Sequence, residues 1–95
     1  MKERDIVKRI KDFMVREYGA TCHKVHTSAY GEIGHCDLWG VLPGGTAYCW
    51  EVKQPGCTAT PAQLAFLERE KANGALVGVV TSVADVERIL STTSA

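Results

Sequence analysis

The chain has 95 residues and a formal net charge of zero, with 45% hydrophobic and 23% charged side chains. This composition is typical of a single globular domain over residues 1–95 and excludes a disordered chain. It argues against a protein that holds nucleic acid by bulk positive charge, although a local basic face is compatible with it. No apolar run reaches the ~18–20 residues of a membrane helix, and the charged N-terminus is not a secretory signal. The four cysteines form no Cys-x-x-Cys pair, which predicts free thiols in the cytoplasm.

The first half of the sequence predicts one helix and three strands. Apolar residues recur three and four apart between residues 2 and 18, a spacing that favours an amphipathic helix. Alternating and β-branched residues predict a strand at about 21–27. Two further strands, at about 36–42 and 47–53, flank Pro43-Gly44-Gly45. That tripeptide is a strong turn signal, so we expect a hairpin.

The second half opens with the clearest helix, over residues 61–73. Thr60 is a good N-cap, Pro61 suits the first helical position, and Gln63 has the spacing of a capping box. The continuous apolar run at 75–80 predicts a buried strand.

A last helix is capped by Ser82 and Asp85 and runs to about Leu90, ahead of a frayed tail at 91–95. The predicted order is α-β-β-β-α-β-α. Its third strand, second helix and fourth strand form a right-handed βαβ unit. We therefore predict an α/β fold with a mixed central β-sheet flanked by helices.

Three charged residues lie in the otherwise apolar strands of the hairpin, namely Asp37, Glu51 and Lys53. Because strand side chains alternate, Glu51 and Lys53 share one face, roughly 7 Å apart. The other face of that strand carries side chains that we expect in the core: Tyr48, Trp50 and Val52. Asp37 shares the face of Glu51 and Lys53 if the residue numbers of two cross-strand partners add up to an even number, as they do when Asp37 is opposite Lys53. A three- or five-residue turn provides that register, whereas a two-residue turn does not.

Two carboxylates in one cleft repel each other unless one takes up a proton or a cation joins them. Hard oxygen ligands favour Mg²⁺ or Mn²⁺. A divalent cation beside a lysine is suited to phosphodiester hydrolysis, because the cation activates water and stabilises charge on the phosphate. The structural alternative, without a catalytic role, is that Glu51 and Lys53 form a surface ion pair on an exposed sheet face.

The combination resembles the PD-(D/E)XK nuclease superfamily, and more narrowly the VRR-NUC family in its small stand-alone phage and bacterial form. The similarity extends from about Glu3 to Glu87. Its most specific parts are Gly34-x-x-Asp37, Trp50-Glu51-Val52-Lys53 and the segment TPAQLAFLEREKANGALVGVV. One departure is Cys36, where the family often has proline.

The resemblance implies a restriction-endonuclease-like fold and assigns roles to several residues. Asp37 and Glu51 would be metal ligands, together with the backbone carbonyl of Val52, and Lys53 would be the catalytic lysine. Gln63 would lie near the active site, and Glu3 would complete the metal site. Both also have structural alternatives, Gln63 as a capping residue and Glu3 as an acid near a helix start.

The resemblance further implies a Mg²⁺- or Mn²⁺-dependent DNA endonuclease in a bacterial or phage-infected cell. Such stand-alone members act as homodimers on branched DNA such as four-way junctions. Dimerisation would bring the basic faces of two protomers together and build a DNA-binding surface that one neutral protomer lacks. The candidates for DNA backbone contacts are Lys8, Lys11, Arg16, Lys24 and His26, and a solvated surface is the alternative for each.

Other functions are consistent with parts of the sequence. A non-catalytic nucleic-acid- or protein-binding module would keep the fold without cleavage. A zinc-stabilised interaction domain would use Cys22, His23 and His26 with His35 and Cys36, although their spacing is unusual for zinc. RNA is an alternative substrate, because no motif reports whether a 2′-hydroxyl is read. Trp50 is expected in the core, and Trp39 shares the face of Asp37.

Overall fold

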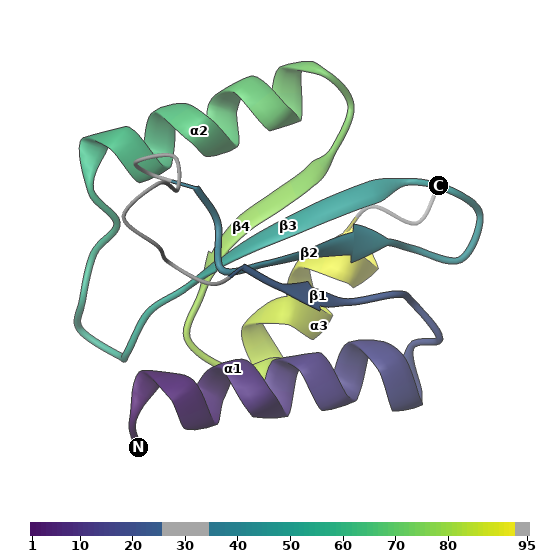
Figure 1. Cartoon of the computed structure of the whole chain (residues 1–95), viewed down its shortest axis with the longest axis horizontal. Coiled ribbons are helices and arrows are strands. Elements are labelled where there is room, and N and C mark those ends of the chain that lie inside the picture. The colour runs from purple at the N-terminus through teal and green to yellow at the C-terminus, as the bar shows by residue number, and fades with distance from the viewer. Residues whose placement is uncertain (26–34, 93–95) are drawn as a thin grey trace.

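Figure 1 shows the computed structural model of the chain, which describes residues 1–25 and 35–92. The predicted order of elements is confirmed. In chain order the elements are α1 (Glu3–Asp12), a π-helical turn η1 (Phe13–Glu17), β1 (His23–Lys24), β2 (Leu38–Val41), β3 (Ala47–Val52), α2 (Pro61–Ala72), β4 (Leu76–Val80) and α3 (Val83–Thr92). Within these described residues no helix is long and apolar enough to span a membrane.

The strands form one mixed sheet in the order β1-β2-β3-β4. The first three strands are antiparallel, and β4 runs parallel to β3 after the crossover through α2. In Figure 1 α2 covers one face of the sheet, and α1 and α3 lie on the other. The predicted fold class, a mixed sheet flanked by helices, is therefore confirmed.

The main core lies between the sheet and the α1–α3 layer. Tyr48, Trp50 and Val52 point into this core with at most 1% of their surface exposed, as their alternation predicts. The amphipathic face of α1 covers them with Ile6, Val7 and Ile10, and η1 adds Met14. At roughly 2 kcal/mol per buried aliphatic side chain, this layer supplies much of the driving force for folding. It also fixes which face of β3 is left for charged residues.

The first helix ends through a π-helical turn instead of a regular α-helical one. The N–H of Tyr18 donates to the carbonyl of Phe13, five residues back, at 2.9 Å. Gly19 follows with a φ of +79°, a conformation that glycine adopts without steric cost. Local periodicity predicted one helix over residues 2–18, because it does not distinguish the two helical hydrogen-bond patterns.

The strand after this helix is shorter than predicted. β1 comprises His23–Lys24, and Val25 extends the pairing by donating its N–H to the carbonyl of Asp37 at 2.8 Å. Residues 26 and 27 of the predicted strand lie outside the described residues. Gly40 on β2 lets the chain before β1 approach closely, because a Cβ there would stand 2.1 Å from the carbonyl oxygen of Thr21.

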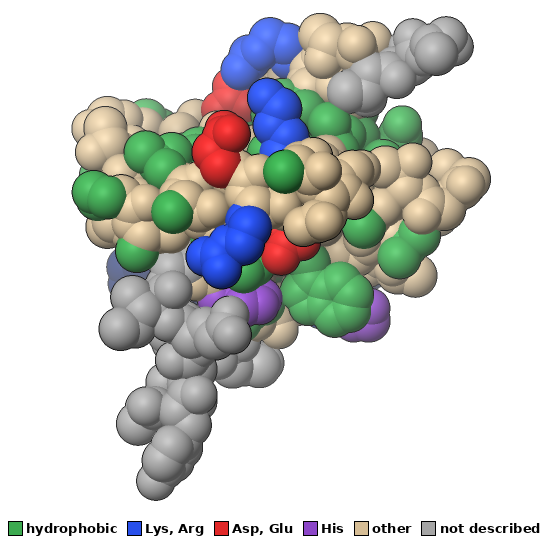
Figure 2. All heavy atoms as spheres, turned by 90° about the horizontal axis from the view of Figure 1, so that it is seen from above, with side chains coloured by type: hydrophobic (Ala, Val, Ile, Leu, Met, Phe, Trp, Pro, Cys, Tyr) green, Lys and Arg blue, Asp and Glu red, His purple; other side chains and the backbone are tan. Residues whose placement is uncertain are grey.

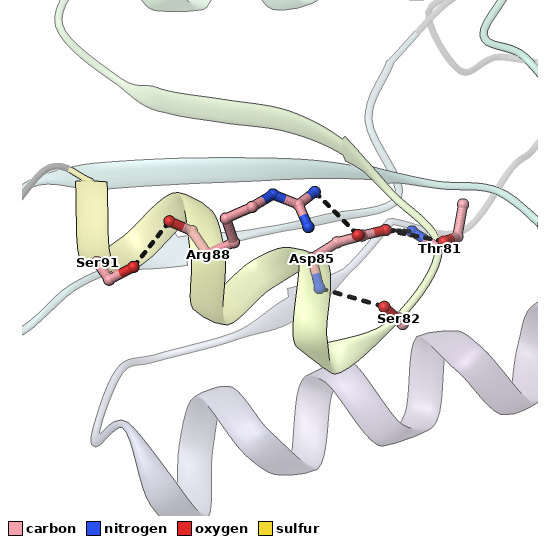
Figure 3. A network of polar contacts seen from close by, with 5 residues as sticks. All are labelled: Thr81, Ser82, Asp85, Arg88 and Ser91. Carbon is pink, nitrogen blue, oxygen red and sulfur yellow. Dashed lines mark hydrogen bonds and ion pairs between the residues drawn. The ribbon is translucent and has the colours of Figure 1, made fainter.

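Both later helices begin with the predicted caps. In α2 the N–H of Gln63 donates to Thr60 Oγ1, and the N–H of Thr60 donates to Gln63 Oε1. In α3 the N–H of Asp85 donates to Ser82 Oγ at 3.2 Å. Figure 3 shows the network around this end of α3, in which Asp85 also accepts hydrogen bonds from Thr81. α3 continues through Thr92, two residues past its predicted end.

Candidate active site

The hairpin register places Asp37 beside Glu51 on the face of the sheet opposite the main core. Leu38 pairs with Trp50 and Trp39 with Cys49, so paired positions have an even sum, as predicted. The length of the turn explains this register. The N–H of Leu42 donates to the carbonyl of Thr46, so the turn between them has three residues, Pro43-Gly44-Gly45. The last paired residue at this end of β2 is Leu38, and the side chain of Asp37, which directly precedes it, interacts with the side chain of Glu51. The example pairing of Asp37 with Lys53 was therefore wrong by two residues, although the shared face was correct.

Asp37 is fixed at this position by two hydrogen bonds to β3. Its backbone N–H donates to the carbonyl of Trp50 at 3.1 Å. Its carboxylate oxygen Oδ2 accepts from the backbone N–H of Val52 at 2.7 Å. These two bonds lie on either side of Glu51, so they hold the Asp37 carboxylate next to the Glu51 side chain. The same N–H bond gives Val52 a fixed backbone position at the candidate site.

Among the described residues, Glu51 is the only polar or charged residue that is buried, with 2% of its surface exposed. Burial, and after it the interaction with the neighbouring Asp37 carboxylate, raise the pKa of the Glu51 carboxyl to about 8. Lys53 opposes these effects, with its Nζ 3.9 Å from Glu51 Oε1. The other oxygen, Glu51 Oε2, is buried and has no hydrogen-bond partner among the described residues.

The three predicted residues of the hairpin therefore lie together. Their donor set fits a divalent cation: two adjacent carboxylates supply hard oxygen atoms, and one oxygen lacks a partner. Within residues 1–25 and 35–92, no three His, Cys, Asp or Glu side chains are grouped so that they could hold a metal ion. A cation here would have two carboxylate ligands from the chain, and it would need further ligands from water, backbone or substrate.

Glu3 and Gln63, the other two predicted site residues, differ in what they contact. Glu3, in the first turn of α1, is near enough for its charge to raise the pKa of Glu51, but it does not form a cluster of three ligands with the two carboxylates. Gln63 has the structural role that its spacing predicts, because its Oε1 accepts the capping hydrogen bond from Thr60. Its side-chain oxygen is thus engaged in the start of α2.

The predicted basic contacts are not gathered at the carboxylates. Lys8 and Lys11 are exposed on α1, and Arg16 is exposed on η1, in the layer across the sheet from α2. Lys24 is exposed on β1 and pairs with Leu38, so it faces the side of the sheet that carries the main core. His26 lies outside the described residues. Their role in DNA binding stays a prediction.

The cysteines do not assemble the zinc site considered above. Cys22 lies in the main core, whereas Cys36 lies on the α2 side of the sheet with Cys49 and Leu67. Burial raises the pKa of the Cys22 thiol. Cys36 and Cys49 interact with each other, and this contact was missed in the sequence, because Cys36 precedes β2 and leaves the strand alternation.

Two aromatic contacts beside the carboxylates were also missed. His23 and Trp39 are cross-strand partners with ring centroids 4.5 Å apart. His35 contacts Phe66 of α2 with centroids 4.6 Å apart. The first contact follows from the β1–β2 register, which local sequence patterns do not report. The second joins residues that are far apart in the sequence.

The fold is similar to those of two solved structures. A solved structure described as "VRR_NUC domain" superposes with a TM-score of 0.78 at 30% sequence identity, covering 97% of each chain. The chain belongs to the VRR_NUC family. A second structure, described as "VRR_NUC domain protein", has a TM-score of 0.74 at 16% identity and covers 97% of this chain and 87% of its own; at that identity it supports the VRR_NUC fold alone. No family sequence model and no curated protein matches the sequence significantly.

Proposed function

We propose that this VRR_NUC protein is a DNA endonuclease that hydrolyses phosphodiester bonds with Mg²⁺ or Mn²⁺. The observation that supports it best is the buried Glu51 carboxylate, which has an unpartnered oxygen and lies beside Asp37 and Lys53. A buried carboxylate of this kind is costly in a protein that uses it only for structure. A divalent cation would neutralise the two acids and satisfy the free oxygen.

In this proposal Asp37 and Glu51 hold the cation, with the Val52 carbonyl as a backbone ligand. The cation, when bound, would lower the pKa of a water molecule and stabilise negative charge on the phosphate. The Lys53 side chain is 17% exposed beside Glu51, so its ammonium group is positioned to orient the attacking water or to balance charge on the phosphate. Water adds to phosphorus, and the bond from phosphorus to one bridging oxygen breaks.

The finer features of the substrate and assembly are carried over from the family resemblance as part of the proposal. They are a preference for branched DNA such as four-way junctions, action as a homodimer, and a cytoplasmic location. In a dimer the basic residues of two chains could contact one DNA molecule, which is compatible with a protomer whose net charge is zero. Light scattering of the purified protein, alone and with DNA, would test the assembly.

The central experiment incubates the protein with labelled linear, flapped and four-way DNA in Mg²⁺, Mn²⁺ or chelator. We expect cleavage only with a cation, and loss of cleavage in Asp37→Asn. Lys53→Met removes the ammonium group but keeps most of the side-chain volume, so cleavage should fall by about 10²–10³-fold while DNA binding persists. Lys71→Met, at an exposed lysine in the last turn of α2, is the matched control.

The result decides between two functions. Cation-dependent cleavage that requires Lys53 supports the endonuclease. DNA or protein binding without cleavage under any of these conditions would instead identify a non-catalytic module with the same fold. Cleavage of an RNA version of the same strands would show that the substrate is not restricted to DNA.

A further inference from the structure

A pocket of about 320 Å³ lies between the sheet and α2. The side chains used in the argument below are His35, Cys36, Trp39, Cys49, Phe66 and Glu70, all of which line it. Its size falls within the range of small-molecule sites. None of its lining residues is one of the proposed ligands or the proposed catalytic lysine.

The sheet fixes how far this pocket is from the candidate active site. Trp39 and Cys49 are cross-strand partners, and Cys49 lies two residues before Glu51 in β3. Two residues in a strand correspond to roughly 7 Å and to side chains on the same face. A group bound between Trp39 and Phe66 would therefore lie about one nucleotide away from a phosphate held at the carboxylates.

The walls of the pocket are aromatic on two sides. On the sheet side, Trp39 is 43% exposed and is supported by His23, with ring centroids 4.5 Å apart. On the helix side, Phe66 is supported by His35, with centroids 4.6 Å apart. Figure 2 views the molecule over α2 and shows histidine and hydrophobic side chains gathered beside this helix, next to charged side chains. Exposed rings held by other rings are suited to stacking on a planar ligand.

The charge of the wall distinguishes a base from a phosphate. Glu70 of α2 lines the pocket and supplies a carboxylate, and among the described residues that line it there is no lysine or arginine. A phosphate would be repelled by that acid, whereas a neutral base would be tolerated and would find a hydrogen-bond acceptor. A base within a duplex is stacked on both sides and paired, so it is not free to enter.

We propose that this pocket binds an unpaired nucleobase of the DNA strand, next to the phosphate held at Asp37 and Glu51. The proposal rests on the endonuclease function and specifies its substrate class as DNA that is unpaired beside the cleaved bond. Trp39 is the main stacking residue, and Phe66 forms the opposite wall.

The test measures binding without cleavage, by tryptophan fluorescence of Asp37→Asn in Mg²⁺. The chain has two tryptophans, and Trp50 is fully buried, so quenching by a ligand reports on Trp39. The probe is a forked DNA with an unpaired arm, compared with the same fork whose arm is entirely abasic. We expect quenching by the first fork, and little quenching with weaker binding by the abasic fork.

Variants separate stacking from general packing. In the same background Trp39→Ala should weaken binding of the intact fork by roughly 5- to 150-fold, the range for loss of one stacking contact. Trp39→Phe should restore most of the affinity, since it keeps an aromatic ring. Val41→Ala is the matched control, because Val41 is an exposed apolar residue of β2 that does not line the pocket.

Equal affinity for the intact and abasic forks, or full affinity in Trp39→Ala, would overturn the base pocket. So would a change of fluorescence with protein concentration alone, which would show that a second copy of the chain covers Trp39. Cleavage of the intact fork by the wild-type protein is measured separately. Absence of cleavage of this fork and of the linear, flapped and four-way DNA would overturn the endonuclease, whereas base-dependent quenching would still support the pocket.

Discussion

The carboxylate of Asp37 accepts a hydrogen bond from the backbone N–H of Val52, with 2.7 Å between oxygen and nitrogen. The side chain of Asp37, which directly precedes β2, thus takes the place of a backbone carbonyl as the acceptor for this N–H of β3. This bond places one carboxylate of the candidate metal site beside the other, because Val52 directly follows Glu51. The same oxygen that orients the acid also keeps a buried N–H satisfied, so Asp37 has both a structural and a proposed catalytic role.

Substitutions at Asp37 should separate these two roles. Asp37→Asn keeps an oxygen that can accept from Val52 but removes the charge, whereas Asp37→Ala removes both. We expect Asp37→Ala to be less stable than Asp37→Asn by about 1–3 kcal/mol, the cost of a buried N–H without a partner. Urea unfolding in chelator measures the difference, and calorimetric titration with Mn²⁺ should show weakened cation binding for both variants. Equal stability of the two would contradict a structural role for the Val52 bond.

The pKa of Glu51 predicts how stability depends on pH without a metal. Its pKa is raised in the folded state, from an ordinary value near 4.5 to about 8. The folded protein therefore binds this proton more tightly than the unfolded chain, and the stabilisation is complete below pH 4.5 and lost as pH rises toward 8. The free energy of unfolding in chelator should fall by up to roughly 1.4 kcal/mol per pH unit across this window.

Glu51→Gln should remove this dependence, since the amide does not titrate. The variant should be more stable than the wild type in chelator at pH 8 and above, and it should not gain stability from Mg²⁺. Glu68→Gln, at an exposed position on α2, is the matched control and should behave as the wild type. A wild-type protein whose stability does not change between pH 5 and about pH 8 in chelator would contradict the raised pKa.

Gln63 provides a test of whether a residue of the family pattern acts in catalysis or in capping. Its Oε1 accepts from the N–H of Thr60 at 2.8 Å. Gln63→Ala should therefore destabilise the protein by about 0.5–2 kcal/mol, and Gln63→Glu should recover most of this loss because it keeps the acceptor. Thermal unfolding and cleavage rates per folded molecule are the measurements. We expect normal cleavage by Gln63→Glu; a stable but inactive Gln63→Glu would instead show that the side-chain amide acts on the substrate.

Local signals in the sequence predicted much of this structure. The caps of α2 and α3 were predictable because each depends on residues three apart. The shared face of Asp37 and Glu51 was predictable once Pro43-Gly44-Gly45 was taken as a three- or five-residue turn, but the exact pairing was not. The burial of Glu51 was not predictable, since strand alternation gives the face on which a side chain lies but not how that face is covered. The interaction of Cys36 with Cys49 was missed for a related reason: Cys36 precedes the strand, so alternation does not determine the side to which it points.

The start of α3 gives a prediction that is independent of the candidate active site. Asp85 accepts hydrogen bonds from the N–H and hydroxyl of Thr81, both at 2.8 Å, and forms an ion pair with Arg88 at 2.9 Å (Figure 3). The bonds from Thr81 lower the pKa of Asp85, and Arg88 adds to this effect. The stabilisation is therefore present above the ordinary pKa of an aspartate and is lost as pH falls through the lowered value.

Asp85→Asn should consequently destabilise the protein by about 1 kcal/mol at neutral pH, with the difference shrinking under acidic conditions. Arg88→Ala should cost less, because the guanidinium group is 67% exposed and exposed ion pairs contribute little. Urea unfolding of the two variants and the wild type at neutral and acidic pH measures both effects. A larger loss from Arg88→Ala than from Asp85→Asn would mean that the ion pair, and not the hydrogen bonds from Thr81, stabilises the start of α3.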